Sequence, residues 1–456
     1  MDLFGMLPGF GNVFFTLGAF VIALSVIVAV HEYGHYIVGR WSGIHAEVFS
    51  IGFGPVLLSR VDRHGTQWQI AALPFGGYVK FLGDADAASA GADGAAVSGM
   101  DAAQRRRTMH GAPLWARSAT VAAGPMFNFM FSIAAFSVYI MVQGLPADAP
   151  RVGAVHPMPP VTATDAGTLQ EGDLITAIEG ERVDSLRDFF REAERLPGQP
   201  VTEYTVLRDG RALTLPGPHP LPARAQGITL QSAARDAGLR PGDVILSIDD
   251  QPVHAFGDLL PIVADAEGAP LTLRIWREGE TFETTLNPRR TDLPLPEGGF
   301  ETRWLIGLQS GTFFETPTRS AGPVEVVPMA AQQTLDVITR SFSGLYHMIA
   351  GEISTCNLSG PIGIATTSGA MASDGLWQFI WFIAVLSTAV GLLNLFPIPI
   401  LDGGHLVFHA YEAVTGKPPS ERVLGVLMAT GLALLGTVML FAIFNDLFCR
   451  FFPAIG

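Results

Sequence analysis

Residues 16–40 read TLGAFVIALSVIVAVHEYGHYIVGR, and this stretch decides the fold class. It continues a charge-free run from Leu3 to Val30, longer than the roughly 20 apolar residues that a helix needs to cross a bilayer. The run leads directly into the ionisable side chains of His31-Glu32-Tyr33-Gly34-His35. Ionisable residues are costly inside a membrane and usually functional there, so the sequence predicts a membrane-spanning helix that carries a chemical site.

The composition supports a membrane protein. Apolar residues make up 48% of the 456 residues and charged residues only 15%, whereas soluble domains carry about 25% charge. The net charge of -14 excludes a general nucleic-acid-binding protein, which would need a basic surface. The acidic start Met1-Asp2, with no small-residue cleavage site behind it, favours a retained anchor over a cleaved signal peptide. Three further charge-free stretches can span a bilayer: 118–147, 375–401 and 423–445.

The basic residues predict the orientation. Cytoplasmic loops carry an excess of Lys and Arg, and the loop between the first two spans is the basic one. We therefore expect this loop and the histidine motif on the cytoplasmic side, and residues 148–374 outside. The fourth span then places the C-terminus outside. The basic residues of this loop are Arg40, Arg60, Arg63, Lys80, Arg105, Arg106, Arg107 and Arg117.

The histidine motif has the spacing of a metal site. His31 and His35 lie one helical turn apart, so both imidazoles can reach one Zn²⁺ ion, and Glu32 beside them can move the proton of a water molecule. Asp402 is expected to supply the third ligand, because the third span runs inward and brings it to the same depth. His405 is the alternative third ligand. The alternative to a metal site is a histidine pair that only faces a polar cavity.

Two prolines near the end of the third span indicate an interrupted helix. Pro397 and Pro399 remove backbone donors from the stretch Asn394-Leu395-Phe396-Pro397-Ile398-Pro399-Ile400-Leu401-Asp402. Freed backbone is tolerated at membrane depth only where it is buried in protein or lines a cavity. The stretch therefore predicts a water-accessible pocket beside the metal.

A β-prone region follows the first span. Residues 48–58 and 68–81 are apolar and flank the turn 62–65, which predicts a membrane-associated β-hairpin or sheet. Gly52 and Gly54 would let another backbone approach closely. An ordinary cytoplasmic hairpin is the alternative.

The external segment contains a duplication. Residues 169–175 (LQEGDLI) align with residues 239–245 (LRPGDVI), an offset of 70. Each copy has a Gly-Asp turn that feeds an apolar strand. This pattern resembles PDZ domains, which bind extended peptides by adding a strand to a sheet edge. We expect two α+β PDZ domains outside the membrane, with a peptide as their ligand.

The remaining segments are less informative. Residues 84–100 are mostly Ala, Gly and Asp, and residues 288–299 are rich in proline, so both are predicted to be linkers. Apolar residues recur at helical spacing from about 325 to 350, which predicts an amphipathic helix. The two cysteines, Cys356 and Cys449, are too few for a disulfide framework or a cysteine-rich zinc module.

Taken together, HEYGH on a first span, NLFPIPILDGGH on a later one and the repeats between them resemble the site-2 protease family of intramembrane zinc metalloproteases. The stretch GPMFNF (residues 124–129) is similar to a further motif of that family. The resemblance implies that His31, His35 and Asp402 bind Zn²⁺ and that Glu32 is the catalytic acid and base. Tyr33 departs from the usual phenylalanine of the family. The residues expected to contact substrate are Asn128, Asn394, Gly52, Gly54, Pro397 and Pro399.

The resemblance also implies an activity. We expect a multi-pass zinc endopeptidase of the bacterial inner membrane that cleaves the transmembrane segments of single-pass proteins. A trimmed anti-sigma factor is the expected substrate, and remnant signal peptides are a second class. The alternatives are a PDZ membrane scaffold with a structural metal site, which would not need Glu32, and a zinc transporter, which would leave the repeats unexplained.

The predicted organisation divides the chain into nine segments. The membrane-associated ones are 1–40 (first transmembrane helix with the histidine motif), 41–83 (β-region), 84–112 (cytoplasmic linker), 113–147 (second transmembrane helix), 375–404 (third transmembrane helix with Leu401-Asp402-Gly403) and 405–456 (cytoplasmic loop and fourth transmembrane helix). The external ones are 148–222 and 223–290 (PDZ-like domains) and 291–374 (linker and amphipathic helices).

Overall fold

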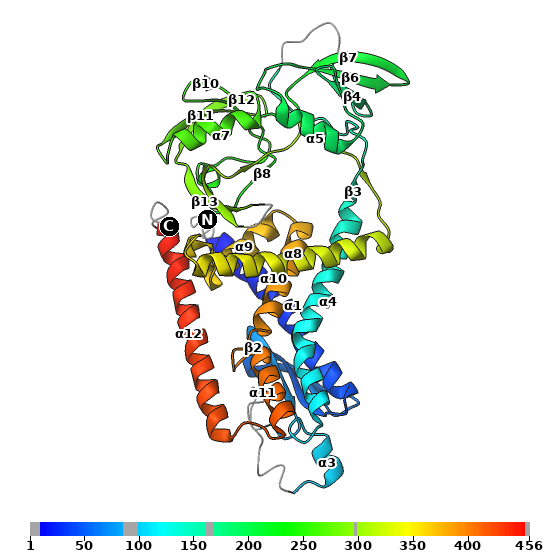
Figure 1. The fold of residues 1–456 in the computed structure, drawn as a ribbon, viewed down its shortest axis with the longest axis vertical. Coiled ribbons are helices and arrows are strands. Elements are labelled where there is room, and N and C mark those ends of the chain that lie inside the picture. Colours follow the sequence, from blue (N-terminus) through cyan, green and yellow to red (C-terminus); the bar gives the residue numbers. More distant parts are fainter. Residues whose placement is uncertain (1–9, 85–98, 161–167, 296–298, 452–456) are drawn as a thin grey trace, which may run out of the picture. The chain divides into compact units, whose positions relative to one another are not determined.

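The computed structural model describes residues 10–84, 99–160, 168–295 and 299–451. The chain folds into two compact units (Figure 1). Most of the predicted linker 84–100, namely residues 85–98, lies outside the described residues, as does the start of the first predicted span. Unit 1 consists of Met1–Ile140, Gly322–Tyr346 and Cys356–Arg450, and unit 2 of Met141–Ala321, His347–Thr355 and Phe451–Gly456.

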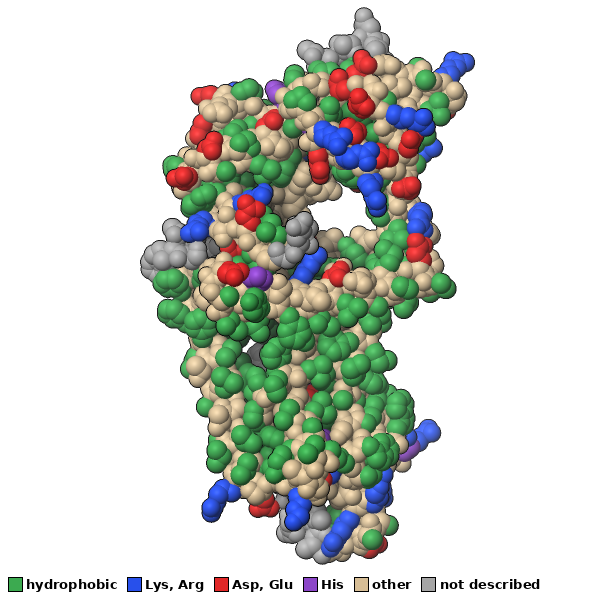
Figure 2. Space-filling view, viewed as in Figure 1, with side chains coloured by type: hydrophobic (Ala, Val, Ile, Leu, Met, Phe, Trp, Pro, Cys, Tyr) green, Lys and Arg blue, Asp and Glu red, His purple; other side chains and the backbone are tan. Residues whose placement is uncertain are grey.

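Unit 1 contains four helices that are long and apolar enough to cross a membrane. The prediction of a polytopic membrane protein is therefore confirmed at this level. Figure 2 shows hydrophobic side chains over the middle of unit 1 and Lys and Arg side chains at the end that carries α3. The four helices are α1 (Phe10–Trp41), α4 (Leu114–Gln143), α10 (Leu376–Asn394) and α12 (Glu421–Phe451).

Small residues bring three of these helices close together. A Cβ atom on Gly34 of α1 would lie 2.6 Å from the carbonyl oxygen of Ala123 in α4, so only glycine fits there. Between α4 and α10, the Ser132 hydroxyl donates to the carbonyl oxygen of Ala384 at 2.9 Å. Small side chains and hydroxyl hydrogen bonds are the usual means of association for helices in a bilayer.

Shorter helices complete unit 1. α9 packs against α1, and a Cβ atom on Gly369 would lie 2.4 Å from the Thr16 hydroxyl oxygen. α8 covers the segment for which an amphipathic helix is predicted, and α11 begins at Asp402. These helices are α3 (Ala102–Arg106), α8 (Pro323–Ile349), α9 (Pro361–Ser373) and α11 (Asp402–Thr415), and a single 3-10 turn covers Thr355–Asn357.

The predicted β-region forms a more complex sheet than a hairpin. β1 (Ala46–Val61) and β2 (Gln67–Phe81) each fold back, so that Phe49 lies opposite Val79 on one side and opposite Trp68 on the other. The later part of β1 also pairs with the start of β2. The four segments lie in the order 56–61, 67–71, 46–51 and 77–81, and residues 77–81 form one edge among the described strands.

Glycines make the fold-back of β1 feasible. Gly52 and Gly54 have positive φ angles of 90° and 83°, a region that side chains with a Cβ atom avoid. A Cβ atom on Gly52 would also lie 2.8 Å from the carbonyl oxygen of Leu73. The folded sheet packs on α1, where Tyr36 joins Phe49 of the sheet in one buried apolar cluster.

Unit 2 contains two sheets of the same strand order. One has the order β5-β4-β6-β7 and the other β10-β9-β11-β12, and corresponding strands and helices begin 69 or 70 residues apart. In the first, β4 is Leu174–Ile178, β5 Glu181–Arg182, α5 Leu186–Arg195, β6 Thr202–Arg208 and β7 Arg211–Gly217. In the second, β9 is Val244–Ile248, β10 Gln251–Pro252, α7 Phe256–Asp265, β11 Leu271–Arg277 and β12 Glu280–Leu286.

The Gly-Asp turn of each repeat holds the same ion pair. Asp173 binds Arg208 at 2.7 Å, and Asp243 binds Arg277 at 2.6 Å. Both carboxylates are buried. Burial alone would raise the pKa of Asp173, but the hydrogen bond and charge of Arg208 outweigh it and lower that pKa. The repeated ion pair thus connects the turn before β4 or β9 to the end of the neighbouring inner strand, β6 or β11.

The prediction of a linker over residues 288–299 is wrong for its first half. β13 (Arg289–Pro294) pairs with β14 (Phe300–Leu305), so this stretch is one arm of a hairpin. Trp304 of β14 packs against the buried core of the second repeat, which holds the hairpin in place. The remaining short elements of unit 2 are β3 (Leu145–Pro146) paired with β16 (Thr318–Arg319), β8 (Gly227–Ile228) paired with β15 (Leu308–Gln309), and α6 (Ala233–Asp236).

Candidate metal centre

His31, His35 and Asp402 lie together in unit 1. The Nε2 atom of His31 lies 3.1 Å from a carboxylate oxygen of Asp402, and the Nε2 atom of His35 lies 3.5 Å from the other. The two Nε2 atoms are 3.1 Å apart. All three candidate ligand atoms therefore lie within 4.8 Å of one another, as the binding of one ion requires.

Helix α4 holds the other nitrogen of each imidazole. The Nδ1 atom of His35 lies 2.8 Å from the carbonyl oxygen of Thr120, and the Nδ1 atom of His31 lies 3.3 Å from the amide of Asn128. A carbonyl oxygen only accepts, so the Nδ1 atom of His35 must carry the proton. In the neutral ring, its Nε2 atom then presents a lone pair to the carboxylate.

This arrangement fits a bound cation. A lone pair that faces a carboxylate is repelled unless a proton or a metal ion lies between them, and a metal ion can meet both imidazoles and the carboxylate at once. One carboxylate oxygen of Asp402, Oδ2, is buried and makes no well-aligned hydrogen bond among the described residues, although the Nε2 atom of His31 lies 3.1 Å from it. Two imidazole nitrogens and one carboxylate are a common ligand set of catalytic zinc sites, and ligating histidines usually have their second nitrogen held as seen here.

Glycines provide the space for this cluster. A Cβ atom on Gly124 of α4 would lie 2.4 Å from the Nε2 atom of His35, so any larger residue would displace the imidazole. On the other side, Cβ atoms on Gly403 and Gly404 would lie 2.3 Å from the carbonyl oxygens of Leu395 and Ile398. The two glycines after Asp402 thus let the loop fold closely over the first turn of α11.

Glu32 lies on α1 between the two histidines in sequence and packs beside the β-sheet. A Cβ atom on Gly77 would lie 3.2 Å from the Cγ atom of Glu32. Gly77 begins the edge segment 77–81, so the carboxyl side chain lies next to a strand edge as well as next to the histidines. The site therefore combines a cluster of candidate metal ligands, an acid and a strand edge.

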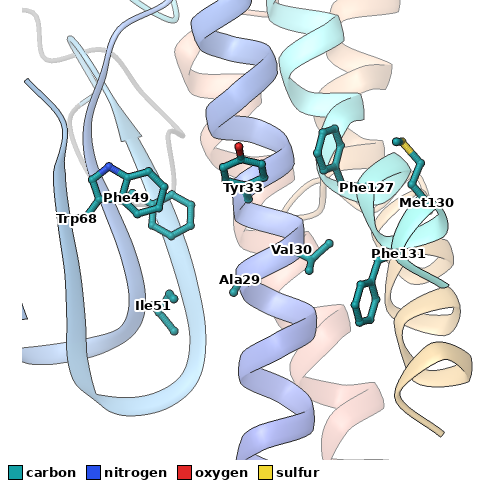
Figure 3. A pocket seen from close by; sticks show the side chains of 9 residues that line it. All are labelled: Ala29, Val30, Tyr33, Phe49, Ile51, Trp68, Phe127, Met130 and Phe131. Carbon is teal, nitrogen blue, oxygen red and sulfur yellow. The ribbon is translucent and has the colours of Figure 1, made fainter. Parts of the chain in front are cut away.

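An apolar cavity of about 480 Å³ lies beside this region, between α1, the sheet and α4 (Figure 3). Val30 and Tyr33 of α1 line it, and they flank His31 and Glu32 in the sequence. Phe49 and Trp68 of the sheet lie across from Phe127 of α4. The other lining residues are Ala29, Ile51, Met130 and Phe131.

The other residues singled out from the sequence lie in varied places. The side-chain amide of Asn394 donates to the Val390 carbonyl oxygen within α10, at 3.0 Å. Pro397 is exposed, whereas Pro399 is half-buried. Gly52 and Gly54 form the fold-back of β1. His405 is not part of the cluster that the described residues form.

The roles of three residues of the site were not predicted from the sequence, although one of them, Gly124, opens the stretch GPMFNF. Thr120 acts through its backbone, which leaves no signal in the residue type. Gly124 and Gly77 act by lacking a side chain, and a glycine inside an apolar helix or strand is the signal that could have identified them.

Comparisons with known proteins identify the family of this chain. A model of Peptidase family M50 matches residues 19–438 of the chain. The chain is 35% identical over 440 residues to a Rhizobium meliloti protein named "Putative zinc metalloprotease", which covers 96% of this chain and 97% of that protein. This chain belongs to Peptidase family M50.

Two further M50 relatives cover nearly the whole chain. An Agrobacterium fabrum protein, also named a "Putative zinc metalloprotease", is 34% identical over 432 residues, 94% of each chain. The Salmonella typhimurium "Regulator of sigma-E protease RseP" is 32% identical over 460 residues, 95% of this chain and 99% of that protein. The predicted metalloprotease activity and the site-2 protease resemblance are therefore confirmed, and zinc is the cofactor of the family.

We expect Asn128 to position His31 rather than to contact substrate directly. Its side chain is fully buried, and its amide faces the Nδ1 atom of His31. Replacement of Asn128 by leucine should weaken zinc binding by about 10- to 100-fold, as is typical when a partner of a ligating histidine is lost. Competition with a chromogenic chelator measures this affinity.

Ser132→Ala is the matched control for Asn128→Leu. Ser132 lies one turn further along α4 and bonds to α10, without contact to His31. Its loss should reduce stability but leave zinc affinity unchanged. Equal zinc affinity in the Asn128→Leu variant and the wild type would contradict the positioning role.

Proposed function

We propose that this protein is an intramembrane zinc endopeptidase of the bacterial inner membrane that cleaves transmembrane segments of single-pass proteins. The observation that carries the proposal is the cluster of His31, His35 and Asp402 with Glu32 beside it on α1. α1 is one of the four candidate membrane spans. A hydrolytic site within such a helix would meet substrates inside the bilayer.

Each residue has a distinct role in this proposal. His31, His35 and Asp402 hold the zinc ion, which when bound supplies Lewis acidity at the scissile carbonyl group. Glu32 takes a proton from the attacking water and delivers it to the nitrogen of the leaving amine. Thr120 and Asn128 hold the imidazoles so that their Nε2 atoms face the ion.

The substrate must present an extended backbone to this site, because a helix engages its own peptide groups in hydrogen bonds. Strand addition at a sheet edge is a common way to hold an extended peptide. The edge segment 77–81 begins beside Glu32, which supports pairing of the unwound substrate with this edge. The apolar cavity lined by Val30, Tyr33 and Phe127 suits an apolar side chain of a transmembrane segment.

We further propose an anti-sigma factor, already trimmed outside the membrane, as the substrate, with remnant signal peptides as a second class. The printed name of the Salmonella relative, a regulator of sigma-E, supports the first class. In this proposal the two repeats of unit 2 are periplasmic PDZ domains that bind or screen peptides, and the metal lies near the cytoplasmic side. Their common strand order and the basic loop around Arg105–Arg107 support these two assignments.

A membrane scaffold with a structural metal is the second candidate. Its support is the pair of repeats, which could tether other envelope proteins. A structural metal site, however, has no use for a half-buried acid beside its ligands. Glu32 therefore favours the protease.

Metal removal tests the proposal. The full-length protein, purified in detergent, is incubated with a single-pass substrate whose external part has been removed. We expect cleavage in the zinc-loaded protein, loss of cleavage after treatment with 1,10-phenanthroline, and recovery when zinc is restored. Gel analysis of the tagged substrate measures the products.

The non-chelating isomer 1,7-phenanthroline serves as the control for unspecific effects on the detergent or the fold. Cleavage that persists after zinc has been removed would exclude the metal-dependent mechanism. Stable zinc binding without cleavage of any trimmed substrate would favour the scaffold.

A further inference from the structure

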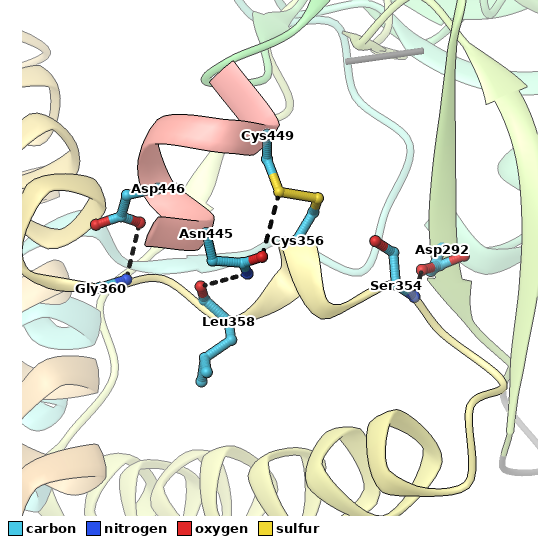
Figure 4. Close-up of a disulfide and its surroundings, with 8 residues drawn as sticks. All are labelled: Asp292, Ser354, Cys356, Leu358, Gly360, Asn445, Asp446 and Cys449. Carbon is cyan, nitrogen blue, oxygen red and sulfur yellow. Dashed lines mark hydrogen bonds between the residues drawn. A yellow bond between two sulfur atoms is a disulfide. The ribbon is translucent and has the colours of Figure 1, made fainter. Parts of the chain in front are cut away.

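The two cysteines of the chain form a disulfide that the metal centre does not use. Cys356 precedes α9 and Cys449 lies near the end of α12, with their Cα atoms 5.8 Å apart and a sequence separation of 93 (Figure 4). Both cysteines belong to unit 1. The bond therefore fastens the C-terminal end of α12 to the segment that leads into α9.

The neighbouring Asp446 adds a second fastening. Its carboxylate accepts hydrogen bonds from the backbone N–H groups of Gly360, Ile362 and Gly363 at 2.8, 3.0 and 2.9 Å. α9 has no side-chain cap of its own at Gly360. Asp446 thus caps a helix that lies elsewhere in the sequence, and its negative charge is favourable at the positive end of that helix.

Asn445 completes the contact. Its buried side-chain amide donates to the carbonyl oxygen of Leu358 at 3.4 Å. We call this set the clip: Cys356, Leu358, Gly360, Ile362 and Gly363 on one side, and Asn445, Asp446 and Cys449 on the other.

Outside the clip, α12 is weakly packed. The only buried residues in its described part are Gly431, Ala442 and Asn445, and the last two lie at or next to the clip. Most of its large apolar side chains are exposed, Leu440 and Phe444 among them. In a bilayer these side chains would contact lipid. Separation of α12 would exchange these lipid contacts for other lipid contacts, so the buried contacts of its described part lie mainly at the clip.

Both sides of the clip are connected by packing contacts to elements that carry the candidate metal ligands. α9 packs on α1 through Gly369 and Thr16, and α1 carries both histidines. α12 packs through Gly431 on Pro399, in the loop that leads to Asp402. A helix that reaches the metal from the bilayer must pass between transmembrane helices, and α12 is the least buried of the four candidate spans.

We propose that the clip is a thiol-controlled latch on α12 that regulates the entry of substrate helices. This inference rests on the proposed function. In the oxidised form the disulfide keeps α12 against the start of α9. In the reduced form the hydrogen bonds of Asn445 and Asp446 remain while the covalent bond is lost, so the fold persists but α12 separates more often and admits substrate more readily.

The redox step requires a partner of defined chemistry. Closing the latch removes two protons and two electrons from the thiols of Cys356 and Cys449. The thiolate of one cysteine attacks a disulfide of a thiol oxidoreductase to give a mixed disulfide, and the second thiolate then displaces the reduced partner. Such exchange takes place outside the cytoplasm, where the orientation proposed above puts both cysteines.

The test compares oxidised and dithiothreitol-treated full-length protein in lipid nanodiscs. Three quantities are measured: hydrogen exchange of residues 440–449, zinc content, and kcat/KM for the trimmed single-pass substrate. We expect reduction to increase exchange at the end of α12, to leave zinc bound, and to raise kcat/KM roughly five- to tenfold, a typical coupling between two sites.

Two variants serve as controls. The double variant Cys356→Ser/Cys449→Ser should behave like the reduced wild type and should not respond to dithiothreitol. Asp446→Asn retains the disulfide, so it should increase exchange at residues 360–365 while kcat/KM stays near the oxidised value.

Two results would overturn the latch. Exchange at 440–449 that does not change on reduction would show that the hydrogen bonds alone hold α12. Increased exchange accompanied by an unchanged or lower kcat/KM would make the disulfide a simple stabilising bond. If neither form cleaves any substrate, the proposed function fails, and because the latch rests on substrate entry it fails too; the exchange data would then report only whether the disulfide fastens α12.

Discussion

Replacement of Glu32 by glutamine is expected to reduce cleavage of a trimmed single-pass substrate by about 10²- to 10⁴-fold, the usual contribution of a general acid and base. Glutamine has nearly the same size as glutamate but can neither take a proton from water nor give one to the leaving amine. Zinc should remain bound, because Glu32 is not one of the three clustered ligands. Single-turnover kinetics together with zinc analysis of the same sample measure both effects.

Glu47→Gln is the matched control for Glu32→Gln. Glu47 lies in β1, where it pairs with Lys80 at 3.8 Å, away from the histidines in sequence. Its loss should leave cleavage nearly unchanged. A Glu32→Gln variant that loses zinc would show that Glu32 acts on the metal, and one that cleaves at the wild-type rate would remove it from the mechanism.

The second large effect is expected for Asp402→Asn. The amide keeps the shape of the carboxylate but removes its negative charge, which neutralises much of the charge of the ion. Zinc affinity should fall by more than about 100-fold, the upper limit for partners that only orient a ligand. Cleavage should disappear at zinc concentrations that saturate the wild type, and isothermal titration of the metal-free protein measures the affinity.

Glu412→Gln controls for the loss of an acid on the same helix. Glu412 lies further along α11 and binds Arg117 of α4 through two hydrogen bonds, at 2.6 and 3.1 Å. Its replacement should lower the melting temperature while zinc binding is retained. Zinc affinity that stays at the wild-type level in Asp402→Asn would contradict the assignment of Asp402 as a ligand. His405 would then be the candidate for the third ligand.

The main features of the membrane unit could be predicted from the sequence. Long charge-free stretches identify spanning helices because a bilayer admits little else. The spacing of His31 and His35 places both imidazoles on one helix face. Asp402 could be added because the predicted topology brings the end of the third span to the same depth, and the model groups these three residues.

The form of the β-region could not be predicted. A sequence of alternating apolar residues indicates strands but not that one strand will fold back. The fold-back depends on the positive φ angles of Gly52 and Gly54. Its consequence is that Gly77, rather than these glycines, packs beside Glu32.

The long-range contacts also could not be predicted from the sequence. Nothing in the local sequence of Asp446 indicates that it caps α9, because the capped N–H groups lie more than 80 residues away. The pairing of Cys356 with Cys449 could have been suspected from topology, since both were expected outside the cytoplasm. Likewise, the residues of the proline-rich stretch 288–299 do not indicate that part of it pairs with β14.

The central claim is zinc-dependent hydrolysis of a peptide bond inside a transmembrane segment. The most direct test is mass spectrometry of the products that the purified, zinc-analysed protein forms from a trimmed single-pass substrate in nanodiscs. Our account predicts one zinc ion per chain and new termini within the apolar segment, both absent after zinc removal. New termini only outside that segment, or none from a fully zinc-loaded protein, would contradict it.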